Sequence, residues 1–345
     1  MNYILDVFFV LAIGFLTFRL LFKDEELSGI IKLIKKAETG WLIVGVFCVF
    51  FFVAGESVII KYMLRLFKVS VPFPSCLKYS FIGFFFSCIT PSASGGQPAQ
   101  MYYMKKDGIK LGHSTLIMLV ITIAYKAVLV LLGLLFIGFH YSYIMSHVGG
   151  LWWLLLIGFA LNLAYIFGLM FVLARPLWAK NAARKLVRLL IRIRILKKKN
   201  YESYVKKINR ICDTYMVGAD YIKHNVKAVL KIFLITLVQR GFLLSVTWIV
   251  YKSYGLSGTS FLDIVAIQTI IGITVEMLPL PGAAGITEAC FSMMFEGIFP
   301  VLLLKPALLL SRGLSFYVLL IMSAVVTLGA HIIVLRKDKK SASAD

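Results

Sequence analysis

The residues that could do chemistry in this sequence are charged side chains inside long apolar segments. Lys126 lies at the centre of "TLIMLVITIAYKAVLVLLGLLF", and Arg240 lies at the centre of "FLITLVQRGFLLSVTW". Charged groups at such positions are costly in a bilayer and usually face a cavity or an opposite charge. Both are too central to reach the membrane surface easily. We expect them to line a cavity, and an internal ion pair that only holds helices together is the alternative.

Four further charged residues lie in or beside apolar segments. Glu276 comes immediately before a break rich in Pro and Gly, and Glu288 follows that break in "GITEACF". Glu288 is near the start of a short helix, where the helix dipole stabilises a carboxylate, so it is either a helix cap or a ligand. Glu56 and Arg312 lie towards the ends of their segments and could instead extend to the membrane surface.

Two breaks interrupt the apolar segments 75–104 and 262–299. They read "TPSASGGQP" and "LPLPGAAG". A helix that starts inside the membrane presents unpaired N–H groups and a positive dipole end, and glycine lets a ligand approach the backbone closely. We therefore expect anion sites at both breaks, unless Pro and Gly only shape helix packing. The prolines that break the helices are Pro91, Pro98, Pro279 and Pro281.

Together these residues predict a site for a lipid headgroup near the middle of the membrane. A phosphate fits the free N–H groups and the basic side chains, whereas an amine fits the carboxylates. The expected phosphate-binding residues are Gly95, Gly96, Gln97, Lys126, Arg240, Gly282, Gly285, Thr287 and Arg312. The expected amine-binding residues are Glu56, Glu276 and Glu288.

The composition predicts an all-α, polytopic integral membrane protein. The chain has 345 residues, of which 60% are hydrophobic and 15% are charged, and its mean hydropathy is +0.88. About 20 consecutive apolar residues suffice to cross the hydrocarbon core. The sequence predicts about six full spans, at 3–22, 41–60, 112–139, 151–174, 228–251 and 306–335.

The net charge of +21 lies mainly in segments that flank the predicted spans. We therefore expect an anionic membrane surface as the partner of these charges, and no nucleic acid. Segment 175–227 has 15 Lys and Arg and three acidic residues, so it is expected in the cytoplasm, as are both termini. Within it, 176–199 predicts a basic amphipathic helix on the membrane surface, with a solvated connector as the alternative.

These orientations place both ends of 75–104 in the cytoplasm and both ends of 262–299 outside, so each is predicted to be a re-entrant pair of half-helices. The stretch "HYSYIMSHVGG" (140–150) is expected as an external loop. Residues 41–139 and 228–335 then have the same order of elements in opposite orientation. That order is typical of an inverted repeat with a substrate site near the midplane. We interpret 1–345 as a single transmembrane domain.

Motifs of soluble enzymes are missing from the sequence. It has no HExxH, P-loop, GxGxxG or GxSxG motif, and its five histidines and five cysteines lack the spacing of metal ligands. We expect no metal, no cofactor and no catalytic site. A membrane-embedded transferase is the less favoured alternative, with Glu276 or Glu288 as its base.

The two break motifs resemble the flippase-like transmembrane domain of the bacterial lysylphosphatidylglycerol synthase/flippase (multiple peptide resistance factor) family. "LPLPGAAGITEA" is similar to that family's Pro-Gly-small-small-Gly-x-x-Glu stretch, here Pro281, Gly282, Gly285 and Glu288. The resemblance covers roughly 10–335. It implies a flippase that moves aminoacylated phosphatidylglycerol from the inner to the outer leaflet of the bacterial cytoplasmic membrane, which gives resistance to cationic peptides.

Full-length members of that family also carry a soluble aminoacyl-transfer domain, and we expect the present chain to act without one. We expect that a separate synthase makes the lipid, or that the substrate is another lipid. On the residues alone, a transporter of an isoprenoid-phosphate carrier or a small anion remains open, as does a scaffold that recruits a synthase through 175–227. The sequence also leaves open a homo-oligomer and the energy source.

Overall fold

The computed structural model describes residues 27–91, 93–193, 201–278, 280, 282–283 and 285–342. This part of the chain is helical and contains no β-strand, which confirms the all-α prediction. The elements are α2 (Leu27–Ile34), α3 (Thr39–Leu66), α4 (Phe73–Ile89), α5 (Gly96–Lys106), α6 (Leu111–Val148), η1 (Gly149–Leu151), α7 (Trp152–Ala174), α8 (Pro176–Arg192), α9 (Tyr201–His224), α10 (Val226–Leu244), α11 (Val246–Ser253), α12 (Phe261–Val275), α13 (Ile286–Met294), α14 (Val301–Arg312), η3 (Gly313–Val318) and α15 (Leu319–Ala342).

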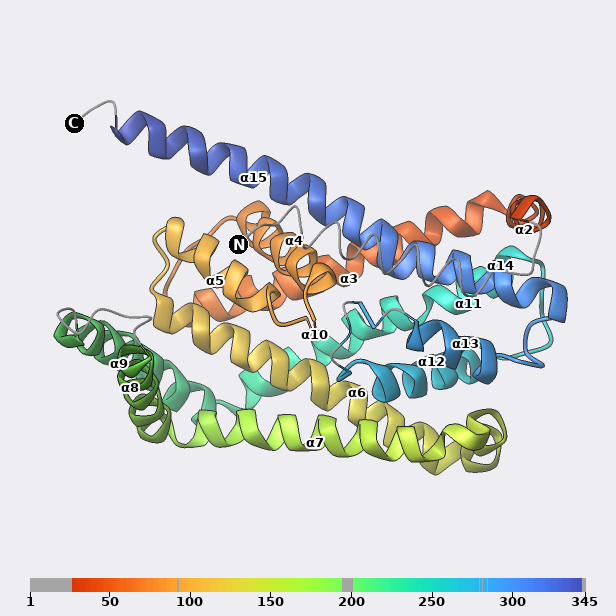
Figure 1. Cartoon of the computed structure of the whole chain (residues 1–345), viewed down its shortest axis with the longest axis horizontal. Helices are drawn as coiled ribbons and strands as arrows, with labels where there is room; N and C mark the ends of the chain where they lie inside the picture. The colour runs from red at the N-terminus through yellow and green to blue at the C-terminus, as the bar shows by residue number, and fades with distance from the viewer. Residues whose placement is uncertain are drawn as a thin grey trace.

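Four helical stretches in the described part are long and apolar enough to cross a membrane. They are Thr39–Leu66, Leu111–Ala174, Val226–Ser253 and Val301–Ile333. The second stretch contains α6 and α7, which pack side by side and are joined by the short turn η1 (Figure 1). The chain is therefore a membrane-embedded helical protein. The predicted span 3–22 lies outside the described residues.

Several helices extend beyond the predicted spans. The stretch 140–148, which we expected to be a loop, belongs to α6, and the helix bends at His140 (φ −129°, ψ 37°). Helix α14 begins at Val301 and continues through the π-helical η3 into α15. Hydropathy marks only the apolar part of a helix, whereas the backbone hydrogen bonds continue into its polar ends.

Both predicted breaks separate short helices. Segment 75–104 forms α4 and α5, and segment 262–299 forms α12 and α13. Helix α4 ends at Ile89, and the following Thr90 is extended (φ −116°, ψ 146°) because Pro91 disfavours a helical residue before it. Helices α5 and α13 have 11 and 9 residues. At about 1.5 Å per residue, each is too short to cross a hydrocarbon core about 30 Å thick.

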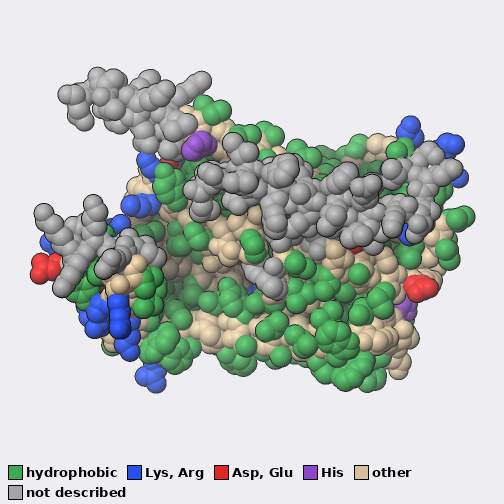
Figure 2. Space-filling model, viewed as in Figure 1, with side chains coloured by type: hydrophobic (Ala, Val, Ile, Leu, Met, Phe, Trp, Pro, Cys, Tyr) green, Lys and Arg blue, Asp and Glu red, His purple; other side chains and the backbone are tan. Residues whose placement is uncertain are grey.

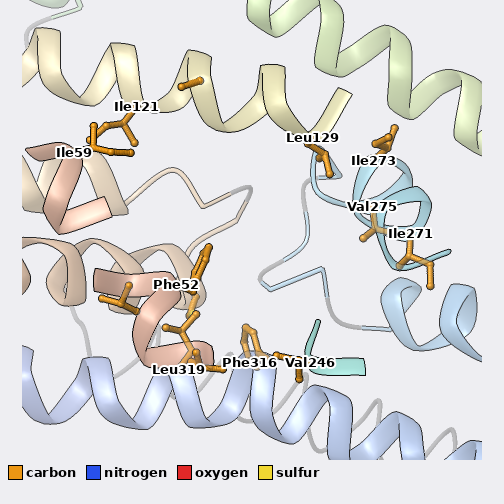
Figure 3. Close-up of a cluster of buried hydrophobic side chains, with 14 of the residues drawn as sticks. Phe52, Ile59, Ile121, Leu129, Val246, Ile271, Ile273, Val275, Phe316 and Leu319 are labelled. Carbon is orange, nitrogen blue, oxygen red and sulfur yellow. The ribbon is translucent and has the colours of Figure 1, made fainter. Parts of the chain in front are cut away.

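A continuous apolar core joins the long helices and the broken ones (Figure 3). Phe52 and Ile59 of α3 are buried with Ile121 and Leu129 of α6 and with Ile273 of α12. Many large apolar side chains are instead exposed, and Figure 2 shows apolar side chains spread over the face that it presents. Extensive exposed apolar surface is typical of a protein that contacts lipid chains. The core therefore fixes the helices against one another, while the outer surface suits hydrocarbon.

The connector 175–227 folds as two helices, α8 and α9, which pack against each other. Lys180 pairs with Asp213 at 3.0 Å, and Arg184 donates to Asn209 at 2.7 Å. The predicted surface helix 176–199 begins at Pro176, as α8 does, but α8 ends at Arg192. Residues 194–200 lie outside the described part.

Candidate functional site

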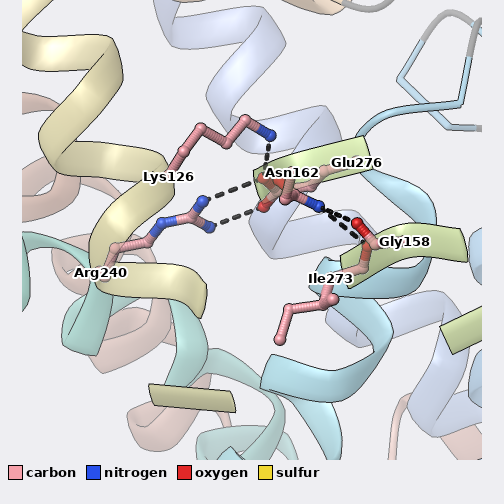
Figure 4. Close-up of polar contacts among 6 residues, drawn as sticks. All are labelled: Lys126, Gly158, Asn162, Arg240, Ile273 and Glu276. Atoms are coloured by element: carbon pink, nitrogen blue, oxygen red, sulfur yellow. Dashed lines mark hydrogen bonds and ion pairs between the residues drawn. The ribbon is translucent and has the colours of Figure 1, made fainter. Parts of the chain in front are cut away.

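Glu276 is the C-cap residue of α12 and accepts hydrogen bonds from two basic side chains (Figure 4). Arg240 Nη1 lies 2.7 Å from Oε1, and its Nη2 lies 3.0 Å from Oε2. Lys126 Nζ lies 2.9 Å from the same Oε2. Helices α6, α10 and α12 thus converge on one carboxylate. The structure brings together three residues that the sequence singled out separately.

The three side chains of this Glu276 cluster differ in exposure. The Arg240 side chain is 1% exposed, the Lys126 side chain 11% and the Glu276 side chain 26%. Arg240 also lies over the ring of Tyr125, 3.5 Å from its centroid. Such a cation–π contact holds the guanidinium plane in place. Arg240 therefore approaches Glu276 from the protein interior, whereas the carboxylate is the most accessible member of the cluster.

The Glu276 cluster has more positive than negative charge. Two basic groups share one carboxylate, so the cluster carries a formal charge of +1 when all three are ionised. An uncompensated charge away from water costs several kcal/mol. An anion that reached Lys126 and Arg240 would remove this imbalance, so the arrangement favours binding of a singly charged anion.

Helix α7 holds the last turn of α12, from which Glu276 extends. Asn162 Nδ2 donates to the carbonyl of Gly158 at 2.8 Å and to that of Ile273 at 3.3 Å (Figure 4). A Cβ atom at Gly158 would collide with the backbone of Ile273 and Thr274. Only glycine permits this close approach of the two helices. Gly158 and Asn162 therefore help to position Glu276.

A second ionic cluster holds the break between α12 and α13. Arg312 Nε donates to Glu288 Oε1 at 2.7 Å, and Arg312 Nη2 donates to the carbonyl of Gly282 at 3.1 Å. The other oxygen of Glu288 accepts the N–H of Gly285 at 2.7 Å. Gly285 has φ 87°, which favours glycine. Gly282, Glu288 and Arg312 form what we call the second-break clamp, in which Glu288 is both helix cap and ion-pair partner.

Polar contacts also tie the first break to its neighbours. Gln100 of α5 donates to the carboxylate of Glu56 on α3, and Gln97 donates to Thr122 on α6. A Cβ atom at Gly96 would collide with Ser87 of α4. The glycine therefore lets α5 pack against α4, which is the structural role that we considered as the alternative to ligand binding.

Backbone N–H groups that we expected to be free are occupied at two positions. Gly95 donates to Thr90 Oγ1 at 2.9 Å, as Gly285 does to Glu288. The Thr287 hydroxyl likewise donates to the carbonyl of Ala283 at 2.8 Å. A ligand at these positions would have to displace the internal acceptors. Pro279 and Pro281 lie outside the described residues, and the binding role of each selected residue stays a prediction.

Sequence reasoning did not select three residues that shape the site. They are Tyr125, Gly158 and Asn162. The signal for Asn162 was a polar amide within an apolar helix, and that for Tyr125 was its place beside Lys126 in the sequence. Gly158 carries little signal, because glycine is common in transmembrane helices.

The fold and these clusters define a polytopic α-helical membrane protein with ionic groups at breaks in its interior helices. A family model described as "Lysylphosphatidylglycerol synthase TM region" matches residues 4–323. The chain belongs to this family, which confirms the resemblance seen in the break motifs. No curated protein matches the chain. Membership in the family supports a function connected with membrane lipids.

Proposed function

We propose that the chain is a flippase for a phospholipid with an anionic group, namely an aminoacylated phosphatidylglycerol such as lysyl-phosphatidylglycerol. The observation that carries this proposal is the contact of Lys126 and Arg240 with one carboxylate. A guanidinium binds carboxylate and phosphate with the same two-pronged geometry. Glu276 therefore holds the place that the headgroup phosphate would take.

Charge supports this exchange of partners. A phosphodiester carries one negative charge, so its arrival would neutralise the Glu276 cluster. The displaced carboxylate would then be available to an amine of the aminoacyl group. Glu56 is a second acceptor for an amine, because the side chain that donates a hydrogen bond to it, Gln100, is neutral. Both signs of charge in a lysylated headgroup, the anionic phosphodiester and the cationic amines, would thus find a partner.

The broken helices would supply the path between leaflets. We propose that α4–α5 and α12–α13 are re-entrant pairs in the inverted halves 41–139 and 228–335, which open the site to each leaflet in turn. The second-break clamp holds one pair in the present conformation. The π-helical η3 begins directly after Arg312, and such irregular turns are frequent at functional sites. The acyl chains would stay in the lipid, and no covalent step is required.

The proposed flippase would act in the bacterial cytoplasmic membrane and would change the charge of the cell surface. The protein would lie in the bacterial cytoplasmic membrane with both termini in the cytoplasm, and a separate synthase would make the lipid. Transfer of a lysylated lipid to the outer leaflet would make the cell surface less negative. Cationic peptides would then bind the surface less strongly, because their attraction to anionic lipids depends on that charge.

The experiment that tests the proposal is lipid transfer in proteoliposomes. Purified protein would be reconstituted with lysyl-phosphatidylglycerol, unmodified phosphatidylglycerol or a polyisoprenyl phosphate, and arrival in the opposite leaflet would be measured. We expect the lysylated lipid to move fastest. Equal transfer rates for lysylated and unmodified phosphatidylglycerol would indicate a scramblase that recognises only the phosphate. Movement of the polyisoprenyl phosphate alone would replace the proposed substrate, and movement of none would overturn transport.

A further inference from the structure

Helix α8 exposes an apolar stripe that nothing in the described part covers. Trp178, Leu186, Leu189 and Ile193 are each more than half exposed. At about 100° per residue these four positions fall within an arc of about 80° on the helix. They therefore form one continuous face, which we call the apolar stripe.

A basic stripe runs beside it on the same helix. Lys185, Arg188 and Arg192 are exposed and fall within an arc of about 60° that borders the apolar stripe. Figure 2 shows Lys and Arg side chains gathered at the end of the molecule where α8 and α9 lie. Apolar and basic faces side by side are typical of helices that lie in a membrane surface.

The remaining side of α8 is already used by α9. Lys180 and Arg184 reach Asp213 and Asn209 of α9. These contacts fix the rotation of α8 about its axis. The apolar stripe consequently stays outward, although burying it against α9 would have been the simplest way to remove it from water.

The position of α8 along the chain brings this face to the membrane. Helix α7 ends at Ala174, and Arg175 (φ −120°, ψ 66°) interrupts the helical backbone before α8 starts at Pro176. Trp178 contacts Phe171 of α7, with ring centroids 5.2 Å apart. Figure 1 shows α8 crossing the direction of α7. A helix that crosses the end of a membrane span lies along the surface, where tryptophan is enriched.

We propose that α8 lies in the cytoplasmic headgroup layer, with its apolar stripe among the acyl chains and its basic stripe on the phosphates of anionic lipids. The positive charge of Lys185, Arg188 and Arg192 complements such a surface, whereas a neutral bilayer would satisfy only the apolar stripe. The proposed position of α8 in the membrane does not depend on which lipid the protein transports, or on whether it transports one.

The test places a fluorescent label on each side of α8 in the full chain. In a background without Cys48, Cys76, Cys88, Cys212 and Cys290, Leu189→Cys labels the apolar stripe. Asn181→Cys is the control on the same helix: Asn181 is exposed and lies within the arc of the basic stripe, which the proposal places at the hydrated headgroups and not among the acyl chains. The protein is placed in nanodiscs of phosphatidylcholine with or without phosphatidylglycerol. Quenching is measured with iodide in water and with nitroxide on the acyl chains. Unchanged size-exclusion elution confirms that each variant is folded.

We expect the label at 189 to be quenched from the lipid and protected from iodide, and the label at 181 to be open to iodide. Phosphatidylglycerol should increase the quenching at 189 from the lipid. Replacing Lys185, Arg188 and Arg192 by Gln should remove that increase, with a loss of about five-fold per charge in the preference for the anionic membrane.

Three results would overturn the proposal. Equal access of iodide to 181 and 189 in both membranes would show a solvated helix. Protection of 189 from both quenchers would show a protein cover, such as a synthase or a second copy. Quenching from the lipid that is the same with and without phosphatidylglycerol would refute the binding of anionic headgroups.

Discussion

Arg240 and Glu276 form a two-pronged ion pair in which the guanidinium side chain is 1% exposed and the carboxylate side chain is 26% exposed. Lys126 shares the same carboxylate. A pair whose only purpose was to hold helices together would need no third charge. The extra cation is the feature that most favours a role in anion binding.

Replacing Lys126 by Met separates a structural role from a binding role. The change leaves Arg240 and Glu276 as a neutral pair, so we expect the free energy of unfolding to change by less than about 1 kcal/mol or to rise. Phosphatidylglycerol binding should nevertheless weaken, because one of the two cations is gone. Thermal unfolding and lipid binding to the purified variant check both points. Lys252→Met in α11 is the control outside the cluster, and a large loss of stability in Lys126→Met with unchanged lipid binding would contradict this role.

Replacing Glu276 by Gln should make the protein depend on an anionic lipid. Lys126 and Arg240 would then lack a counter-charge, which destabilises the fold in a neutral membrane or detergent. A lipid phosphate could supply the missing charge and stabilise the folded state by mass action. The melting temperature should therefore rise more on addition of phosphatidylglycerol in the variant than in the wild type. An equal rise in both proteins would argue against phosphate binding at this position.

The charged residues of this site were predictable, but their partnerships were not. Lys126, Arg240 and Glu276 attract notice because charges are rare within apolar segments. Their meeting depends on the packing of α6, α10 and α12, and Lys126 and Glu276 are 150 residues apart in the sequence. The sequence also could not show that Glu288 accepts hydrogen bonds from both Gly285 and Arg312. Local patterns give the chemical type of a residue, whereas tertiary packing decides which residues touch it.

The fold, too, could be predicted only in part from the sequence. Hydropathy located α3, α7 and the two broken segments, because apolar length and Pro/Gly breaks are local signals. It did not locate the end of α6 at Val148, because "HYSYIMSHV" is polar enough to resemble a loop. Nor did it predict the π-helical η3, in which the Phe316 ring lies 4.8 Å from the Arg312 guanidinium.

Gly158→Ala should destabilise the protein by about 1–3 kcal/mol. The added methyl group would meet the backbone of Ile273 and Thr274, which cannot move aside as a flexible side chain can. Gly168→Ala is a matched control on the same helix, because no neighbouring atom lies within 4 Å of the point that its new Cβ would occupy. Thermal unfolding of both variants provides the comparison. Equal melting temperatures would contradict the close packing of α7 and α12.

Glu288→Gln and Arg312→Gln should each loosen the second break and should not be additive. Each change removes the same ion pair, so the double variant should lose less stability than the sum of the two single variants, with a coupling of about 0.5–3 kcal/mol. Hydrogen exchange should be faster in 285–294 in all three variants, because the second-break clamp no longer holds the start of α13. Strictly additive losses would show that the second-break clamp does not act as a unit.

The most direct test of the central claim is the rate at which lysyl-phosphatidylglycerol crosses a proteoliposome membrane with wild-type protein and with Arg240→Lys. Lysine keeps the charge but cannot form the two-pronged contact. We predict transfer faster than in protein-free liposomes for the wild type and at least about ten-fold slower transfer for Arg240→Lys, since the loss of one charge-assisted hydrogen bond costs about 1.5–3 kcal/mol. Gly168→Ala should behave as the wild type. Wild-type transfer no faster than in protein-free liposomes, or an unchanged rate in folded Arg240→Lys, would contradict the claim that this cluster carries the phosphate across.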